Sequence, residues 1–237
     1  MTYDQALLQK TLAPLGIAPE DATLAQLERF AAFLLERNQT LNLTALVSPS
    51  DIAVKHFADS LSALPFLPPE PGVRVLDLGT GGGFPGIPLL IARPDLQLTL
   101  MDSTRKKLVF VAEALQMLGL SASVRHARAE EAGQDSALRA QFDFCVSRAV
   151  AELRVLAEYC LPFVSVGGHF LAMKGANADA EIQAAKQSLR LLGGEIAEIR
   201  RFSLGEAGER TLILVKKLSQ SPTKYPRPAA QLAKAAL

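Results

Sequence analysis

One stretch of the 237-residue chain decides the fold: Val75-Leu76-Asp77-Leu78-Gly79-Thr80-Gly81-Gly82-Gly83-Phe84-Pro85-Gly86. An apolar run typical of a buried strand leads directly into a cluster of glycines. Glycine weakens a fold unless its backbone freedom or its missing side chain is used, so the cluster indicates a tight turn that a ligand approaches closely. The stretch therefore predicts a strand, a ligand-binding loop and a helix in succession.

The sequence after residue 73 predicts an α/β fold with a doubly wound, Rossmann-like sheet. Short β-branched runs alternate with helical stretches, which is typical of a parallel sheet with helical crossovers. Strands are expected over 73–79, 97–103, 122–128, 142–148, 169–174 and 211–216, and helices over 106–118, 151–161 and 179–191. Gly119 and the pair Gly193-Gly194 are expected to end the first and the last of these helices.

The first 70 residues are predicted to form an N-terminal helical extension. Apolar residues between 24 and 35 follow a helical period, with Thr23 as the expected N-cap. A second helix is expected over 49–64, capped by Ser50. A cluster of prolines between 65 and 71 then suggests a boundary. The expected division is 1–70, a ligand-binding domain over 71–218 and a basic C-terminal tail over 219–237.

Composition excludes several classes of protein. No apolar run reaches the ~18 residues that a membrane helix needs, and the chain does not begin with the pattern of a signal peptide. Cys145 and Cys160 lie in apolar stretches and are expected to be buried, reduced thiols of a cytoplasmic protein. The three histidines are not spaced as zinc ligands, so no metal site is expected.

The net charge of +1 conceals an uneven distribution. Residues 211–237 carry five lysine or arginine residues and no acid. Such asymmetry suggests a polyanionic partner, although a terminus of this kind can also be simply a solvated end. Because residues 219–228 are rich in serine and proline, this segment is expected to be extended or mobile.

The glycine spacing alone admits two cofactors. Gly81-x-Gly83-x-x-Gly86 satisfies the nicotinamide dinucleotide fingerprint, and the loops of S-adenosylmethionine-binding domains share its character. Asp77 would repel a pyrophosphate but attract a sulfonium and an ammonium, and Pro85 shortens the run of amides that would grip a phosphate. Asp102, at the end of the second strand, would accept ribose hydroxyls from either. These features favour S-adenosylmethionine, with a nicotinamide cofactor as the alternative.

Further segments are more specific than the fold. They are Asn42-Leu43-Thr44, His56-Phe57-x-Asp59-Ser60, the glycine loop continued by Ile87-Pro88, Val146-Ser147-Arg148-Ala149 and Lys224-Tyr225-Pro226-Arg227. In this order they resemble the bacterial small-subunit rRNA guanine-N7 methyltransferase family, known as RsmG or GidB. The resemblance runs from about residue 25 to residue 227. After Arg227 the chain departs from the family, which often continues with further basic residues.

The resemblance implies a cofactor, a partner and a set of site residues. The cofactor would be S-adenosyl-L-methionine, and the substrate a guanine of 16S rRNA, either as free RNA or in the 30S particle. The implied cofactor-binding residues are Gly79, Gly81, Phe84, Asp102, Ser103, Thr104, Ala129, Glu130 and Arg148. Simpler interpretations remain for some of these: Glu130 as an acid favoured at a helix start, and Arg148 as a surface arginine.

The implied chemistry needs few protein groups. N7 of guanine carries a lone pair and no proton, so direct displacement at the methyl carbon requires no general base, and catalysis depends on positioning and electrostatics. Arg148 is the expected catalytic residue, holding cofactor and guanine in line. The basic tail and the N-terminal helices are candidates to line the RNA approach. A monomer is expected, and a small-molecule or protein methyltransferase or a non-catalytic regulator remains a rival.

Overall fold

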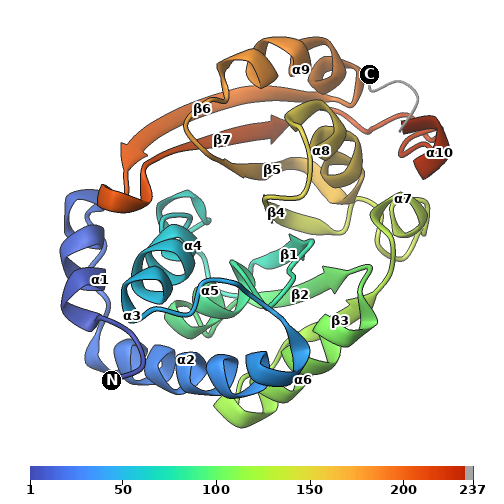
Figure 1. Cartoon of the computed structure of the whole chain (residues 1–237). Helices are drawn as coiled ribbons and strands as arrows, with labels where there is room; N and C mark the ends of the chain where they lie inside the picture. Colours follow the sequence, from blue (N-terminus) through green and yellow to red (C-terminus); the bar gives the residue numbers. More distant parts are fainter. Residues whose placement is uncertain (233–236) are drawn as a thin grey trace.

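In the computed structural model, which describes residues 1–232 and 237, a seven-stranded sheet lies between two layers of helices (Figure 1). The strand order is β3-β2-β1-β4-β5-β7-β6. Five strands are parallel: β1 Arg74–Leu78, β2 Gln97–Asp102, β3 Ser123–His126, β4 Phe142–Arg148 and β5 Val164–Lys174. The order reverses between β1 and β4, and their carboxyl ends meet at one edge. The predicted doubly wound sheet is confirmed.

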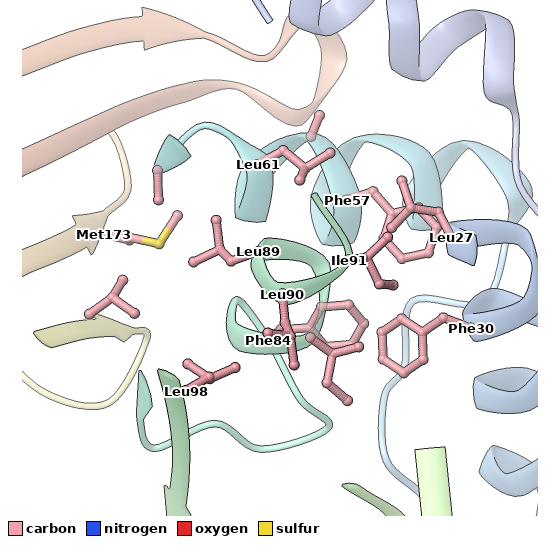
Figure 2. Close-up of a cluster of buried hydrophobic side chains, with 14 of the residues drawn as sticks. Leu27, Phe30, Phe57, Leu61, Phe84, Leu89, Leu90, Ile91, Leu98 and Met173 are labelled. Atoms are coloured by element: carbon pink, nitrogen blue, oxygen red, sulfur yellow. The ribbon is translucent and has the colours of Figure 1, made fainter. Parts of the chain in front are cut away.

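The N-terminal helices form part of one layer rather than a separate body. They are α1 Gln5–Leu12, α2 Asp21–Leu41 and a continuous helical stretch of α3 Pro49–Asp51, a π-helical segment Ile52–Ala58 and α4 Asp59–Leu61. With α5 Gly86–Ala92 and α6 Arg105–Leu118 they cover one face of the sheet (Figure 1). Figure 2 shows the resulting apolar cluster, in which Phe30 and Phe57 of the N-terminal helices share one core with Leu90 of α5.

Two predicted helix starts are wrong, although both helices are present. Helix α2 begins at Asp21, so Thr23 lies inside it. At the start of α3 the side chain of Ser48, not Ser50, accepts a hydrogen bond from the amide of Asp51 at 3.1 Å. Proline is favoured at the first helical position because it has no N–H there that would lack a partner. With Pro49 in that position, the N-cap is the residue before it, Ser48.

The other face of the sheet is covered by α7 Ala129–Ala132, α8 Leu153–Cys160 and α9 Asp179–Leu191 (Figure 1). Cys145 and Cys160 are both free and lie buried in this core. Single 3₁₀ turns lie between the longer elements, at Ala13–Leu15, Leu64–Phe66, Leu161–Phe163 and Gly205–Ala207, and the short helix α10 Ala229–Leu232 is the last element. Among the described residues, no helix combines the length and apolar character needed to cross a membrane.

One strand was not predicted. β6 Gly194–Ser203 pairs antiparallel with β7 Glu209–Lys217, and β7 pairs antiparallel with β5. The sequence of β6 is dense in charge, and a shift in register between Ile196 and Glu198 breaks its alternation of apolar and polar residues. Charged side chains are common on an edge strand because they discourage pairing with another chain. They also hide the two-residue alternation of apolar and polar residues by which a strand is predicted from sequence.

The segment 219–228, expected to be extended or mobile, contains no helix or strand and is packed on the domain. Arg139 donates hydrogen bonds to the carbonyls of Ser221 at 2.8 Å and Tyr225 at 2.7 Å. Arg227 forms a two-pronged ion pair with Glu158 of α8, whose side chain is fully buried. Two of the five cations of residues 211–237, Arg227 and the buried Lys217, are therefore engaged within the protein. Lys234 lies outside the described residues.

Candidate functional site

The glycine loop is tied to the end of β2. The amides of Gly79 and Thr80 both donate to the carbonyl of Met101, at 2.8 and 3.1 Å. Gly79 and Gly81 have φ angles of +80° and +57°, which side chains rarely tolerate. A Cβ at Gly79 would also lie 2.4 Å from a methyl group of Val150. The loop backbone therefore needs glycine at the surface where a ligand would approach.

Asp77 supports this loop from beneath, which corrects the expectation that it faces a cofactor. Its side chain is fully buried. One carboxylate oxygen accepts hydrogen bonds from the hydroxyl of Thr80 at 2.6 Å and from the amide of Gly86 at 2.8 Å. The other oxygen has no partner among the described residues. Asp77 thus joins both ends of the loop, and its contacts are with the protein.

The burial of Asp77 makes stability depend on pH. Burial raises the pKa of Asp77 to about 6, against the lowering effect of the Thr80 and Gly86 hydrogen bonds. The folded state therefore holds a proton that the unfolded state releases near pH 4. The free energy of unfolding should fall by about 3 kcal/mol, relative to Asp77→Asn, as pH rises from about 4 to about 6. Urea unfolding of both proteins across this range tests it, and parallel curves would contradict it.

Gly86 is the clearest steric constraint in the loop. A Cβ there would lie 2.6 Å from a carboxylate oxygen of Asp77 and 2.3 Å from a methyl group of Leu100, both buried. Gly86→Ala should lower the free energy of unfolding by about 1–3 kcal/mol, measured with urea. Gly82→Ala is the matched control, since its Cβ would meet only the Phe84 ring at 3.7 Å. Equal stability of the two variants would refute the constraint.

A cleft of about 450 Å³ opens at the carboxyl ends of β1, β2, β3 and β4. It brings together most of the predicted site residues: Gly79, Gly81, Asp102, Ser103, Thr104, Ala129, Glu130 and Arg148. Asp102 accepts hydrogen bonds from the amides of Gly81 at 2.9 Å and Thr104 at 2.7 Å, one on each oxygen. Each carboxylate oxygen can accept a second hydrogen bond. We call this the first cleft.

Phe84 is the one predicted site residue that does not line the first cleft. Its ring is 5% exposed and packs against Phe30 at a centroid distance of 5.3 Å (Figure 2). The imidazole of His56 stacks on it at 4.3 Å, and the guanidinium of Arg148 lies 5.3 Å from its centroid. Phe84 therefore supports Arg148 from the core.

Arg148 joins the first cleft to a second one. Its guanidinium donates to the carbonyl of Lys55 at 3.1 Å and to Asp59 at 2.8 Å, so it is not an accidental surface arginine. The other oxygen of Asp59 accepts a hydrogen bond from Arg210 of β7 at 2.8 Å. These residues line the second cleft, of about 600 Å³, which also contains Lys174. The two clefts share Arg148 and Ala149.

His56 also lines the second cleft, as a neutral imidazole. Its Nε2 lies 3.0 Å from the hydroxyl of Thr44, and its Nδ1 has no partner among the described residues. Burial, with the nearby charge of Arg148, lowers the pKa of His56 to about 4. His56 and Asp59 are therefore not a local helix pair, because their main contacts are with Thr44 and with arginines distant in the sequence.

Several site residues were not predicted. Lys107, Arg128, Tyr159 and Ala229 line the first cleft, and Glu181 and Arg210 line the second. No local pattern marks Arg210, whose partner Asp59 lies 151 residues earlier. Within the described part of the chain, no group of three or more histidine, cysteine, aspartate or glutamate side chains could hold a metal ion.

Comparison with known proteins places this geometry in a family. The family model GidB, described as rRNA small subunit methyltransferase G, matches residues 23–213. The chain is 46% identical over 215 residues to ribosomal RNA small subunit methyltransferase G of Pelotomaculum thermopropionicum, covering 90% of each chain. It is 41% identical to the protein of the same name from Symbiobacterium thermophilum, over 100% of this chain and 99% of the relative.

A solved structure supports the fold independently. A SAM-dependent O-methyltransferase from Thermotoga maritima superimposes with a TM-score of 0.55 at 16% identity, over 80% of this chain and 72% of that one. At this identity the likeness concerns the fold alone. The family model and the relatives go further, since each spans most of the chain. The chain therefore belongs to the GidB family of rRNA small subunit methyltransferases.

Proposed function

We propose that the chain transfers a methyl group from S-adenosyl-L-methionine to N7 of a guanine in small-subunit rRNA. The observation that carries the proposal is the meeting of two clefts at Arg148, on the carboxyl edge of a parallel sheet. Open α/β sheets bind ligands at this edge. A transferase needs one cleft for the donor and another for the acceptor, joined where the group passes. Relatives of high similarity are named as small-subunit rRNA methyltransferases.

The first cleft fits the cofactor. Its glycine backbone, at Gly79 and Gly81, lets a ligand approach without side-chain interference. Asp102 keeps free acceptor positions on both oxygens for the ribose hydroxyls, and Ser103 and Thr104 lie beside it. Ala129 and Glu130 would lie against the adenine. Phe84 would act through Arg148 rather than by contact.

The proposed methyl transfer requires little of the protein beyond alignment of the two substrates. S-adenosylmethionine held in the first cleft would supply an electrophilic methyl carbon, which would bond to the N7 lone pair as the carbon–sulfur bond breaks and its electron pair stays on sulfur. No proton moves, so no side chain needs to act as a base. Arg148 is fixed by Asp59, by the Lys55 carbonyl and by the Phe84 ring, and we assign to it the alignment of guanine with the first cleft. Fixed positive charge there can also orient the RNA.

Cations around the clefts are suited to phosphate. Lys107 and Arg128 line the first cleft, and Arg128 and Lys224 share a neighbouring depression. Contacts between such groups and RNA phosphates make binding sensitive to salt. Of the C-terminal cations, Lys216 and Lys224 are exposed. Cutting the chain after Lys217 would remove Arg227 and leave Glu158 buried without its partner. A loss of RNA binding in the truncated protein could therefore not be distinguished from a loss of stability.

We further propose that the protein acts in the cytoplasm as a monomer. Bacterial small subunits assemble in the cytoplasm, and one chain contains both clefts and Arg148 between them. Sedimentation of the purified protein at the mass of two chains would contradict the monomer.

The direct test is methyl transfer to small subunits from a strain that lacks this modification. With labelled S-adenosylmethionine, the label should appear in 7-methylguanosine after digestion of the RNA. Free rRNA and assembled 30S particles should be tried side by side, because either is a possible substrate. Label in another nucleoside, or in a metabolite pool instead of RNA, would refute the proposal.

A further inference from the structure

The second cleft contains an ion pair whose free atoms remain available to a ligand. Lys174 ends β5 and Glu181 lies in the first turn of α9, and their charged groups are 2.7 Å apart. Met173 is the register partner of Arg148 on the neighbouring strand, so Lys174 lies one residue beyond the point where the two clefts meet. The pair is therefore close to the proposed site of transfer without being part of the cofactor cleft.

The protein holds both side chains through only some of their polar atoms. Lys174 donates to the carbonyl of Ala151, and its Nζ lies 2.7 Å from Oε2 of Glu181. Oε2 of Glu181 also accepts a hydrogen bond from the amide of Leu153, the first residue of α8, at 2.8 Å. Among the described residues no hydrogen bond reaches Oε1 of Glu181, and of the three N–H groups of the Lys174 ammonium only one donates to a hydrogen-bond acceptor, the Ala151 carbonyl. An acceptor and a donor thus lie side by side in the cleft.

This arrangement matches one nucleobase. The Watson–Crick edge of guanine presents two adjacent donors, N1–H and N2–H, next to the acceptor O6. The free Oε1, with its two lone pairs, can accept from both donors while a neighbouring ammonium donates to O6. Adenine and cytosine present an acceptor where guanine has N1–H, and uracil has no second donor beside its N3–H. Unstacked bases are commonly read along this edge.

We propose that the Lys174–Glu181 pair reads the Watson–Crick edge of the target guanine. This inference rests on the proposed function and names the contact that would select its base. The contact leaves N7 free, because N7 lies on the other edge of the purine. Of the other cations that line the cleft, Arg148 and Arg210 are held by Asp59 and Lys55 pairs with Asp51, and together they give the cleft the positive charge that suits a nucleotide.

The test pairs a change in the protein with a change in the base. The substrate is a small subunit reconstituted with RNA that carries either guanine or inosine at the target position, since inosine lacks only the 2-amino group. Inosine should lower kcat/KM of the wild-type protein about 10- to 100-fold. Glu181→Gln should lower kcat/KM by a similar factor with guanine. With inosine, Glu181→Gln should lose a smaller factor than with guanine, because inosine lacks the 2-amino donor and keeps only N1–H for the carboxylate.

Two further variants make the outcome specific. Lys174→Met removes donation to O6, which inosine keeps, so it should lower kcat/KM equally for guanine and inosine, and it replaces Glu181→Gln should that variant fail to fold. Asp179→Asn is the matched control on the same turn of α9, since Asp179 pairs with Arg201 and does not line the cleft. Unchanged affinity for S-adenosylmethionine in each variant would show that the first cleft is intact.

Other results overturn the inference in distinguishable ways. If the wild-type protein methylates inosine as well as guanine, or if Glu181→Gln keeps the full preference for guanine, the pair does not read the base. If Lys174→Met changes the preference for guanine over inosine, the donor and acceptor are assigned to the wrong groups. If the wild-type protein transfers no methyl group to guanine in small subunits, the proposed function itself fails.

Discussion

Replacing Asp102 by alanine should raise the dissociation constant for S-adenosylmethionine about 100-fold. The carboxylate holds the amides of Gly81 and Thr104 and, on the proposed function, both ribose hydroxyls. Its loss removes the ligand contacts and also frees two segments of the cleft wall. Isothermal titration with S-adenosylmethionine measures the effect in the absence of RNA.

Asp102→Asn separates the two contributions. Asparagine keeps one side-chain oxygen as an acceptor, so its dissociation constant should lie between those of the wild-type protein and the alanine variant. The melting temperature of each variant shows whether the fold is intact. Wild-type affinity in a folded Asp102→Ala protein would refute the assignment of the first cleft to the cofactor.

Replacing Arg148 by alanine should lower kcat for methyl transfer about 100- to 1,000-fold at saturating cofactor and RNA. The guanidinium lies where the two clefts meet, and its contacts with Asp59, the Lys55 carbonyl and the Phe84 ring fix its position. Because Arg148 is also expected to touch the cofactor, a smaller loss of cofactor affinity should accompany the fall in kcat. Initial rates with both substrates at saturation separate the two effects.

Two controls accompany this variant. Arg148→Lys keeps the charge but lacks the planar group that can bridge Asp59 and the backbone, so it should restore only part of the rate. Arg200→Ala removes another arginine that lies over a phenylalanine ring, Phe66 at 4.3 Å, but that lines neither cleft. Full kcat in Arg148→Ala would show that alignment does not depend on this residue.

The sequence predicts the strands and the glycine loop well because local patterns determine them. The limits of β4 are those predicted, and Gly119 ends α6 in a left-handed conformation. Strand β6 was missed because its charges hide the period, and the roles of Asp77 and Phe84 could not be read from their positions. A pattern shows that a residue ends a strand or follows a glycine, but not which way its side chain points.

Contacts between distant segments were the least predictable. Asp59 meets Arg148 and Arg210 only after β4 and β7 are placed in the sheet, and no local feature marks Arg210. Glu158 did carry a signal, since an acid in the apolar sequence of α8 suggests a buried partner. Its partner, Arg227, still could not be chosen from the several C-terminal cations.

The pairing of Glu158 with Arg227 has a consequence for biosynthesis. Arg227 follows Glu158 by 69 residues in the chain, and Glu158 belongs to the core on one face of the sheet. While the chain is being translated, α8 must therefore carry a carboxylate that the packed core would bury without compensation. During translation, α8 is therefore expected to pack stably on the sheet only after the segment that carries Arg227 has left the ribosome.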